Sequence, residues 1–232
     1  MPEFAGAAAE EELVAVTDVP EEEPRVPLRD QVHDELQARI SDGRLRPGDR
    51  LFEQELAIEF GVSRVPVREA IRMLQSAGMV EVRPRRRGVF VRSLDRQQLE
   101  ELFDVREALE ALAARLAAER SESADVEHLG ELVARAREAL DDQDTDAMSE
   151  ANTEFHDKLV ALSRNELLAS MLEPLHGRLA ALFRLNLEPA RVCREHEELY
   201  AAIASGDAER AAELARGHVR ASRTMVLERM VL

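Results

Sequence analysis

The chain has 232 residues, of which 45% are hydrophobic and 34% charged, and a formal net charge of -16. This length is enough for two modest domains with packed cores. With no Trp and one Tyr, an aromatic platform for single-stranded nucleic acid is disfavoured. The single cysteine, Cys193, excludes an internal disulfide and suits a reducing compartment.

The first residues carry no targeting signal that we recognise. MPEFAGAAAEEELVAV lacks the basic start and the long apolar run of a secretory signal. No apolar run in the chain approaches the roughly 20 residues that span a bilayer. We therefore expect a cytoplasmic protein with no membrane partner. Residues 1–24 hold eight acids and no bases, which predicts a disordered acidic tail.

The rest of the chain consists of a basic segment followed by an acidic one. Residues 25–92 hold fourteen arginines against ten acids, whereas residues 93–232 hold seventeen bases against twenty-nine acids. A basic segment inside an acidic chain indicates that this segment meets a polyanion. We predict one domain over residues 25–92 and a second over residues 93–232.

The basic segment opens with two short helical patterns. Apolar residues recur every four positions from Leu28 to Ile40, which predicts a helix that ends at Gly43. RLRPGDRL, residues 44–51, is typical of a turn. A second helix is expected over residues 53–60.

A third helix is predicted from the segment SRVPVREAIRMLQSAGMV. Ser63 can cap this helix, Pro66 suits its first turn and Gly78 ends it. MVEV and GVFV then indicate two short strands joined by RPRRR. A helix, a helix-turn-helix and a two-stranded basic wing together outline a winged helix-turn-helix domain.

Arginines lie where such a domain meets duplex DNA. The N-terminal part of the third helix reaches base edges in the major groove, and Arg64 and Arg68 occupy that place. Arg72, one turn further on, suits a phosphate. The alternative is that these arginines only form a solvated helix face. This alternative is disfavoured because the turn, the row of arginines on the helix and the basic wing all occur in the order of a DNA-binding domain. At the wing tip, phosphates or the minor groove suit Arg85, Arg86, Arg87 and Gly88.

The C-terminal segment has helical periodicity throughout, so the fold class expected is mainly α. Six helices are predicted, near residues 95–119, 124–142, 145–162, 166–187, 190–204 and 207–230. Arg106 falls inside the apolar stripe of the first of these helices. A buried charge is costly unless it is paired, so either an acid on a neighbouring helix or an anionic ligand is expected beside it.

Several histidines also fall on or beside apolar stripes. His156, His196 and His218 do so on three different helices, and His176 lies near the inner edge of a fourth. One inward histidine is usually an ordinary core residue, but three or four in one bundle also suit a divalent ion such as zinc or nickel.

Residues 26–92 closely resemble the N-terminal domain of GntR-family transcriptional regulators. The family signature SRxPVREALxxLxxxGLV is nearly matched by SRVPVREAIRMLQSAGMV. The resemblance implies operator contacts by Arg64, Arg68 and the wing near Gly88, with Gln54 added from the preceding helix. The usual wing sequence RPGRGTFV is replaced by RPRRRGVFV in this chain.

The C-terminal segment resembles the FCD effector domain of the FadR subfamily. The similar pieces are DVREALEALAARLAA, NTEFHDKLVALSRNELL and EHEELYAAIASGDAERAAELARGHV. In metal-binding members an Asp or Asn joins three histidines, and the matching residues are Asn152, His156, His196 and His218. An amide oxygen at Asn152 is a weaker ligand than the more usual Asp carboxylate. Six helices imply the VanR-type branch.

The resemblance further implies a small organic acid as effector. Arg106 is then the leading carboxylate-binding residue, and Asn186 is a second candidate. Together these features predict a homodimeric, effector-responsive repressor that binds double-stranded operator DNA.

Two other functions compete with that of a repressor. A metal-dependent enzyme is disfavoured because the sequence lacks the two ExxH motifs of carboxylate-bridged di-metal sites, and no obvious general base lies beside the histidines. We therefore expect no catalytic residue. An architectural DNA-binding protein without an effector would leave the inward histidines as ordinary core residues.

Overall fold

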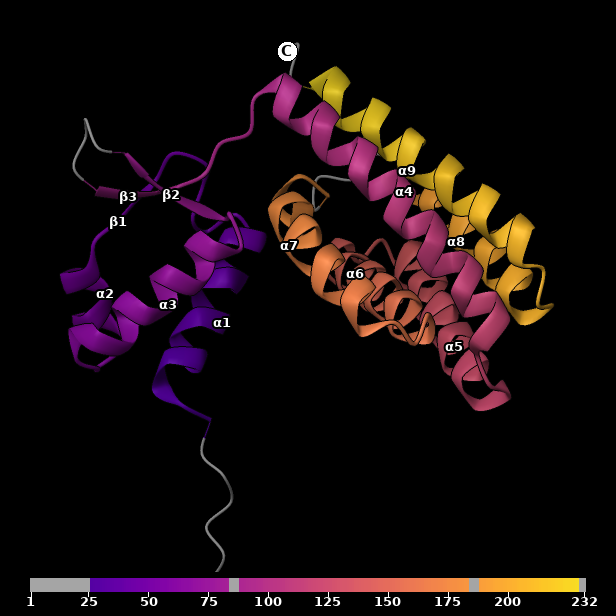
Figure 1. Ribbon diagram of the computed structural model, residues 1–232, viewed down its shortest axis with the longest axis horizontal. Coiled ribbons are helices and arrows are strands. Elements are labelled where there is room, and N and C mark those ends of the chain that lie inside the picture. The colour runs from indigo at the N-terminus through magenta and orange to yellow at the C-terminus, as the bar shows by residue number, and fades with distance from the viewer. Residues whose placement is uncertain (1–25, 84–87, 184–187, 230–232) are drawn as a thin grey trace, which may run out of the picture.

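A computed structural model describes residues 26–83, 88–183 and 188–229 (Figure 1). The predicted acidic tail over residues 1–24 lies outside this range. Among the described residues, two clusters of elements follow the charge division of the sequence. The N-terminal one contains three helices and a small sheet, and the C-terminal one is helical.

Three helices form the body of the N-terminal part: α1 (Leu28–Ser41), α2 (Glu53–Glu59) and α3 (Arg64–Ser76). Their apolar faces meet around Leu36, Val67 and Leu74, which are fully buried. Ser63 stands at the N-cap of α3 with an extended backbone, but its side chain makes no capping hydrogen bond. The cap position was predicted correctly and the expected bond is absent.

A three-stranded sheet completes the domain, where two strands were predicted. Its strands are β1 (Arg50–Leu51), β2 (Val80–Arg83) and β3 (Gly88–Val91), in the antiparallel order β1-β3-β2. Leu51, expected in a turn, pairs with Val89 and is buried. A strand of two residues is too short to show alternation in a sequence, so the prediction missed it.

Six helices of the C-terminal part lie within the described residues and agree closely with the predicted ones. They are α4 (Arg96–Arg120), α5 (Ser123–Asp141), α6 (Thr145–Leu162), α7 (Glu166–Phe183), α8 (Pro189–Ala204) and α9 (Ala208–Arg229). The predicted extension of the fourth bundle helix to residue 187 lies outside the described range. Pro189, expected as a break, is the first residue of α8, where its missing N–H costs nothing.

Local signals explain where these helices begin. Asp95 accepts a hydrogen bond from Gln98 N at 2.8 Å, and the Gln98 side chain accepts one from Asp95 N, which forms a capping box before α4. Asn165 accepts a bond from Leu168 N at the start of α7, as predicted.

The long helices α4 and α9 run side by side along one edge of the bundle (Figure 1). Helix α7 lies on the side that faces the N-terminal domain, where it contacts α1. None of the described helices is both long and apolar enough to cross a membrane.

Candidate DNA-binding face and histidine pocket

The N-terminal half of α3 presents an arginine pair. The side chains of Arg64 and Arg68 are 59% and 47% exposed. Val67, Ala70 and Ile71 of the same helix pack in the core on a neighbouring face. Helical spacing therefore places both guanidinium groups on the solvent side, as the sequence predicted.

A carboxylate of α2 holds this pair together. Glu53 Oε2 lies 3.3 Å from Arg64 Nη2 and 3.1 Å from Arg68 Nη2. Partial burial opposes the charge of Glu53, but the hydrogen bonds from Arg68 and Arg64 outweigh it and lower the pKa of this carboxyl. The two guanidinium groups are thus preorganised around an anionic oxygen.

The other residues predicted to contact DNA surround this pair or lie outside the described range. Gln54 is exposed on α2, and Arg72 is exposed and pairs with Glu69 at 2.6 Å. Gly88 begins β3, where a Cβ atom would lie 2.7 Å from Arg50 Nε. Arg85, Arg86 and Arg87 lie outside the described residues.

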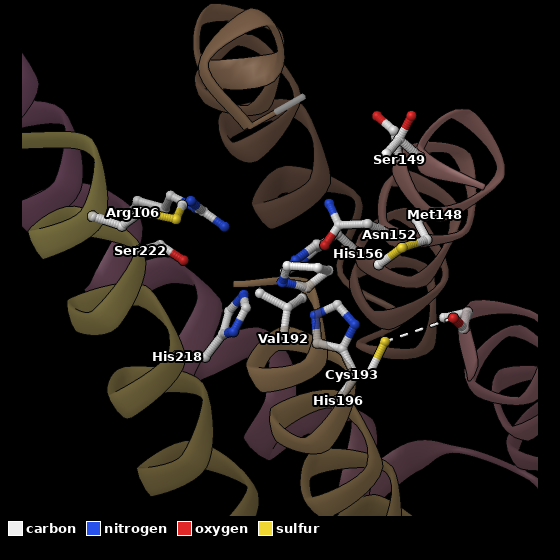
Figure 2. A pocket seen from close by; sticks show the side chains of 14 residues that line it. Arg106, Met148, Ser149, Asn152, His156, Val192, Cys193, His196, His218 and Ser222 are labelled. Atoms are coloured by element: carbon white, nitrogen blue, oxygen red, sulfur yellow. Dashed lines mark hydrogen bonds between the residues drawn. The ribbon is translucent and has the colours of Figure 1, made fainter. Parts of the chain in front are cut away.

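Three buried histidines converge inside the bundle. His156 of α6, His196 of α8 and His218 of α9 are 7%, 2% and 5% exposed. One nitrogen of each ring lies within 4.8 Å of one from each of the others, and Figure 2 shows the three rings pointing toward one another. The structure therefore brings together the three histidines that the sequence singled out.

The surroundings keep one unprotonated nitrogen of each ring available as a ligand. Burial lowers the pKa of His156 and of His196 well below the usual range, so both are neutral near pH 7. His218 Nδ1 lies 2.8 Å from Glu195 Oε2 and donates to it, which leaves Nε2 as the available nitrogen. Phe155 stacks on His196 at a centroid distance of 4.0 Å.

Asn152 lies one turn before His156 on α6 and lines the same cavity (Figure 2). This cavity has a volume of about 80 Å³, which at about 30 Å³ per molecule is room for roughly three water molecules. Apart from the histidines and Asn152, its polar lining includes Arg106, Thr145, Ser149 and Ser222. The space suits an ion together with a small molecule.

Arg106 pairs with an acid of its own helix, where an acid on a neighbouring helix or an anionic ligand was expected. Arg106 Nε donates to Glu110 Oε1 one turn further along α4, and both residues are almost fully buried. Glu110 Oε1 also accepts from His176 Nε2 at 3.1 Å. Burial opposes the charge of Glu110, but Arg106 and His156 outweigh it and hold the pKa of Glu110 well below its usual range. Asn186 lies outside the described residues.

Sequence reasoning missed Glu110, Glu195 and Glu53 as parts of these sites. Glu110 falls on the same stripe as Arg106, four residues later, and that spacing was the available signal. Glu195 and Glu53 give no such signal for these sites, because the histidine and the arginines that they contact there come from other helices.

The donor set fits a metal ion. His156 Nδ1 and His196 Nε2 are buried without a hydrogen-bond partner among the described residues, which is costly for a polar atom unless something else binds there. Three imidazoles with an amide oxygen nearby are ligands suited to zinc or nickel. The cluster could therefore hold a divalent metal.

Two family models match the chain. Residues 28–91 match the model of bacterial regulatory proteins of the gntR family, and residues 101–221 match the FCD domain. The first match contains the arginine pair of α3, and the second contains all three buried histidines and Arg106.

Relatives over most of the chain carry the names of transcriptional regulators. The HTH-type transcriptional regulator McbR of Escherichia coli is 33% identical over 75% of this chain and 80% of its own length. A regulator from an unstable DNA locus of Streptomyces ambofaciens is also 33% identical, over 83% and 82%. The structure of E. coli McbR/YncC has a TM-score of 0.79 and 27% identity, and covers 89% of this chain and 100% of that one. These matches confirm the expected fold and the expectation of a regulator, not an enzyme.

Proposed function

Because the chain belongs to the GntR family of bacterial regulatory proteins and carries an FCD domain, we propose that it is a homodimeric repressor controlled by a small organic acid. The acid would bind beside a metal ion in the histidine pocket and change the affinity for operator DNA. One observation supports this control most: the three buried histidines open on the same small cavity as Arg106.

Arg64 and Arg68 would contact base edges in the major groove, with Gln54 beside them. Arg72, the wing arginines Arg85, Arg86 and Arg87 and the wing residue Gly88 would meet the sugar-phosphate backbone. On binding, a DNA phosphate or base would replace the Glu53 oxygen between the two guanidinium groups. The exposure of this pair supports the assignment.

In the pocket, Asn152, His156, His196 and His218 would hold the metal. A bound divalent ion would supply a positive charge and an open coordination position for an anion. Arg106 lies on the same cavity, so a carboxylate could face both charges at once. The neutral amide of Asn152 would leave more of the metal's charge to that carboxylate than an Asp would. Asn186 remains a second candidate for the effector site.

Metal binding can be tested by native mass spectrometry and by calorimetry with zinc or nickel. We expect wild type to bind one ion per chain, and His196→Ala to lose at least tenfold in affinity. His128→Ala is the matched control, because His128 is exposed on α5 and pairs only with nearby Glu131. Equal affinity in all three proteins would contradict the assignment.

Control by an effector can be tested with the metal-loaded protein. DNA affinity would be measured while small mono- and dicarboxylic acids are titrated in. At least one acid should weaken DNA binding about 5- to 150-fold, the usual range of coupling between sites. If every acid in the panel binds the pocket without changing DNA affinity, the regulatory proposal is wrong.

Three further assignments rest on the same reading. Two copies of the chain would bind the two half-sites of a pseudo-palindromic operator, and the dimer would set the distance between these half-sites. Sedimentation with and without DNA can test whether the chain is a dimer. We also propose that the two domains meet between residues 92 and 93, which is supported by one family match that ends at residue 91 and another that begins at residue 101. The six bundle helices in the described residues favour the VanR-type branch.

A further inference from the structure

A second cavity lies where the two domains meet. It is a cleft of about 130 Å³, lined from the N-terminal domain, the connection at residues 92–94 and the bundle. In Figure 1 this is the region where the chain leaves the sheet and where α7 faces the N-terminal domain. The cleft is separate from the histidine pocket and shares no lining residue with it.

The walls of this cleft are apolar. Ile40 of α1 and Met79 and Val91 beside the sheet line one side, and each is at most 6% exposed. Leu94 and Leu99 line the other side, before and within α4. Such walls favour an apolar group inside the cleft, because burial removes its surface from water.

Two arginines lie on the same cleft, and its described lining includes no acid. Arg92 Nε is buried without a hydrogen-bond partner among the described residues, and the oxygen paired with it, Glu81 Oε2, is 4.0 Å away. Burial and the positive charge of Arg92 lower the pKa of Arg178. Arg92 therefore has only a distant anionic partner, and no acid among the described lining residues lies beside Arg178 in the cleft.

Arg178 is held in place from the DNA-binding domain. Its Nε donates to the carbonyl oxygen of Ala77, the residue that ends α3, at 3.0 Å. A Cβ atom at Gly78 would lie 2.2 Å from Arg178 Nη2, so only glycine leaves room for this approach. Gly78 also adopts a φ of +71°, which favours glycine.

From this geometry we infer that the cleft is a binding site for a small carboxylic acid with an apolar tail. The tail would lie between Met79 and Leu99, and the carboxylate would bind Arg92 and Arg178. Guanidinium and carboxylate groups form strong charge-assisted hydrogen bonds in such a setting. A neutral or cationic molecule of the same shape would lack this interaction.

A ligand here would act directly on the joint between the domains. Arg178 contacts the end of α3, while His176, two residues earlier on α7, contacts Glu110 in the bundle at 3.1 Å. An occupant would bridge α7 and the connection after the sheet, and so stiffen the arrangement of the DNA-binding domain. This inference does not depend on a metal or an effector in the histidine pocket.

The test is calorimetry on the full chain with hexanoate, hexanol and hexylammonium as probes. We expect saturable binding of hexanoate and at least tenfold weaker binding of the other two. Arg92→Met and Arg178→Met should each weaken hexanoate binding about tenfold or more, because each removes one charged partner. Arg96→Met is the matched control, since Arg96 lies outside the cleft and pairs with Glu100.

Two further measurements show whether hexanoate binds in this cleft. In His196→Ala, hexanoate binding should persist, which separates this cleft from the histidine pocket. The Met79 methyl signal should shift on titration in wild type, which tests the site even if Arg178→Met fails to fold. The inference is overturned if hexanoate does not bind, if Met79 does not respond, or if only His196→Ala abolishes binding.

Discussion

Glu53 lies 3.3 Å from Arg64 and 3.1 Å from Arg68 through a single oxygen, between the two arginines proposed to contact DNA. Deep in the bundle, Glu110 plays a comparable part for Arg106. The carboxylate of Glu53 is partly exposed and can be displaced, whereas that of Glu110 is buried in the core. The two pairs should therefore respond differently to loss of the acid.

Replacing Glu53 by Gln should strengthen binding to duplex DNA of any sequence by about threefold to tenfold. The change removes one negative charge that faces the polyanion and competes for both guanidinium groups. Glu59→Gln is the control, because Glu59 ends α2 and pairs with Arg39. Fluorescence anisotropy at fixed salt measures the effect, and equal affinities in the two variants would refute it.

Replacing Glu110 by Gln should lower the free energy of unfolding by about 3–5 kcal/mol, because it removes the carboxylate that forms a buried ion pair with Arg106. Glu107→Gln on the same helix should cost less than about 1 kcal/mol, since its partner Arg220 is exposed. Urea unfolding of both variants measures the difference. Similar losses would mean that the buried pair contributes no more than the exposed one.

Helix α7 is a bundle helix that packs against the N-terminal domain. Three consecutive residues face different neighbours: His176 bonds Glu110, Gly177 faces Met79 and Arg178 bonds Ala77. At Gly177 a Cβ atom would lie 3.4 Å from Met79 Sδ. A Cβ atom at Gly177 would already be in van der Waals contact with Met79, so a much larger side chain would not fit without a shift.

Gly177→Leu should push α7 away from Met79 and loosen the joint. Amide hydrogen exchange across β2 should become at least about fivefold faster. Gly217→Leu is the control, because a Cβ atom there meets nothing within 4 Å. Leu favours a helix more than Gly does in both positions, so the difference isolates the contact with Met79. Unchanged exchange in Gly177→Leu would show that the joint does not depend on this contact.

The elements were predictable where one local pattern decides them. Apolar spacing located the bundle helices to within a residue or two where they are described, and Gly43 and Gly78 marked helix ends with positive φ. Strand β1 was missed because its two residues become a strand only by pairing with β3. The apolar stripe correctly predicted that Arg106 is buried. The acid that pairs with it was expected on another helix, whereas Glu110 lies four residues further along the same helix.

Across the whole molecule, the arrangement of charge follows the two domains. Arg64 and Arg68 face solvent on α3 of the N-terminal domain, while the acidic bundle encloses His156, His196 and His218. The apolar stripes indicated that these histidines point into the bundle, and the family resemblance grouped them with Asn152. Spacing alone could not show the grouping, because the three histidines come from different helices. The cleft between the domains could not be predicted, since it arises only from how they pack.

The most direct test of the division between DNA binding and ligand binding is one set of affinities. A short duplex, selected by the wild-type protein from random-sequence DNA, is titrated with wild type, with Arg64→Ala/Arg68→Ala and with His196→Ala. The double variant should bind at least about 100-fold more weakly, because each base contact contributes about 1–3 kcal/mol. It should still bind metal, whereas His196→Ala should keep its DNA affinity and lose the metal. If the double variant holds the duplex as tightly as wild type does, the account is wrong.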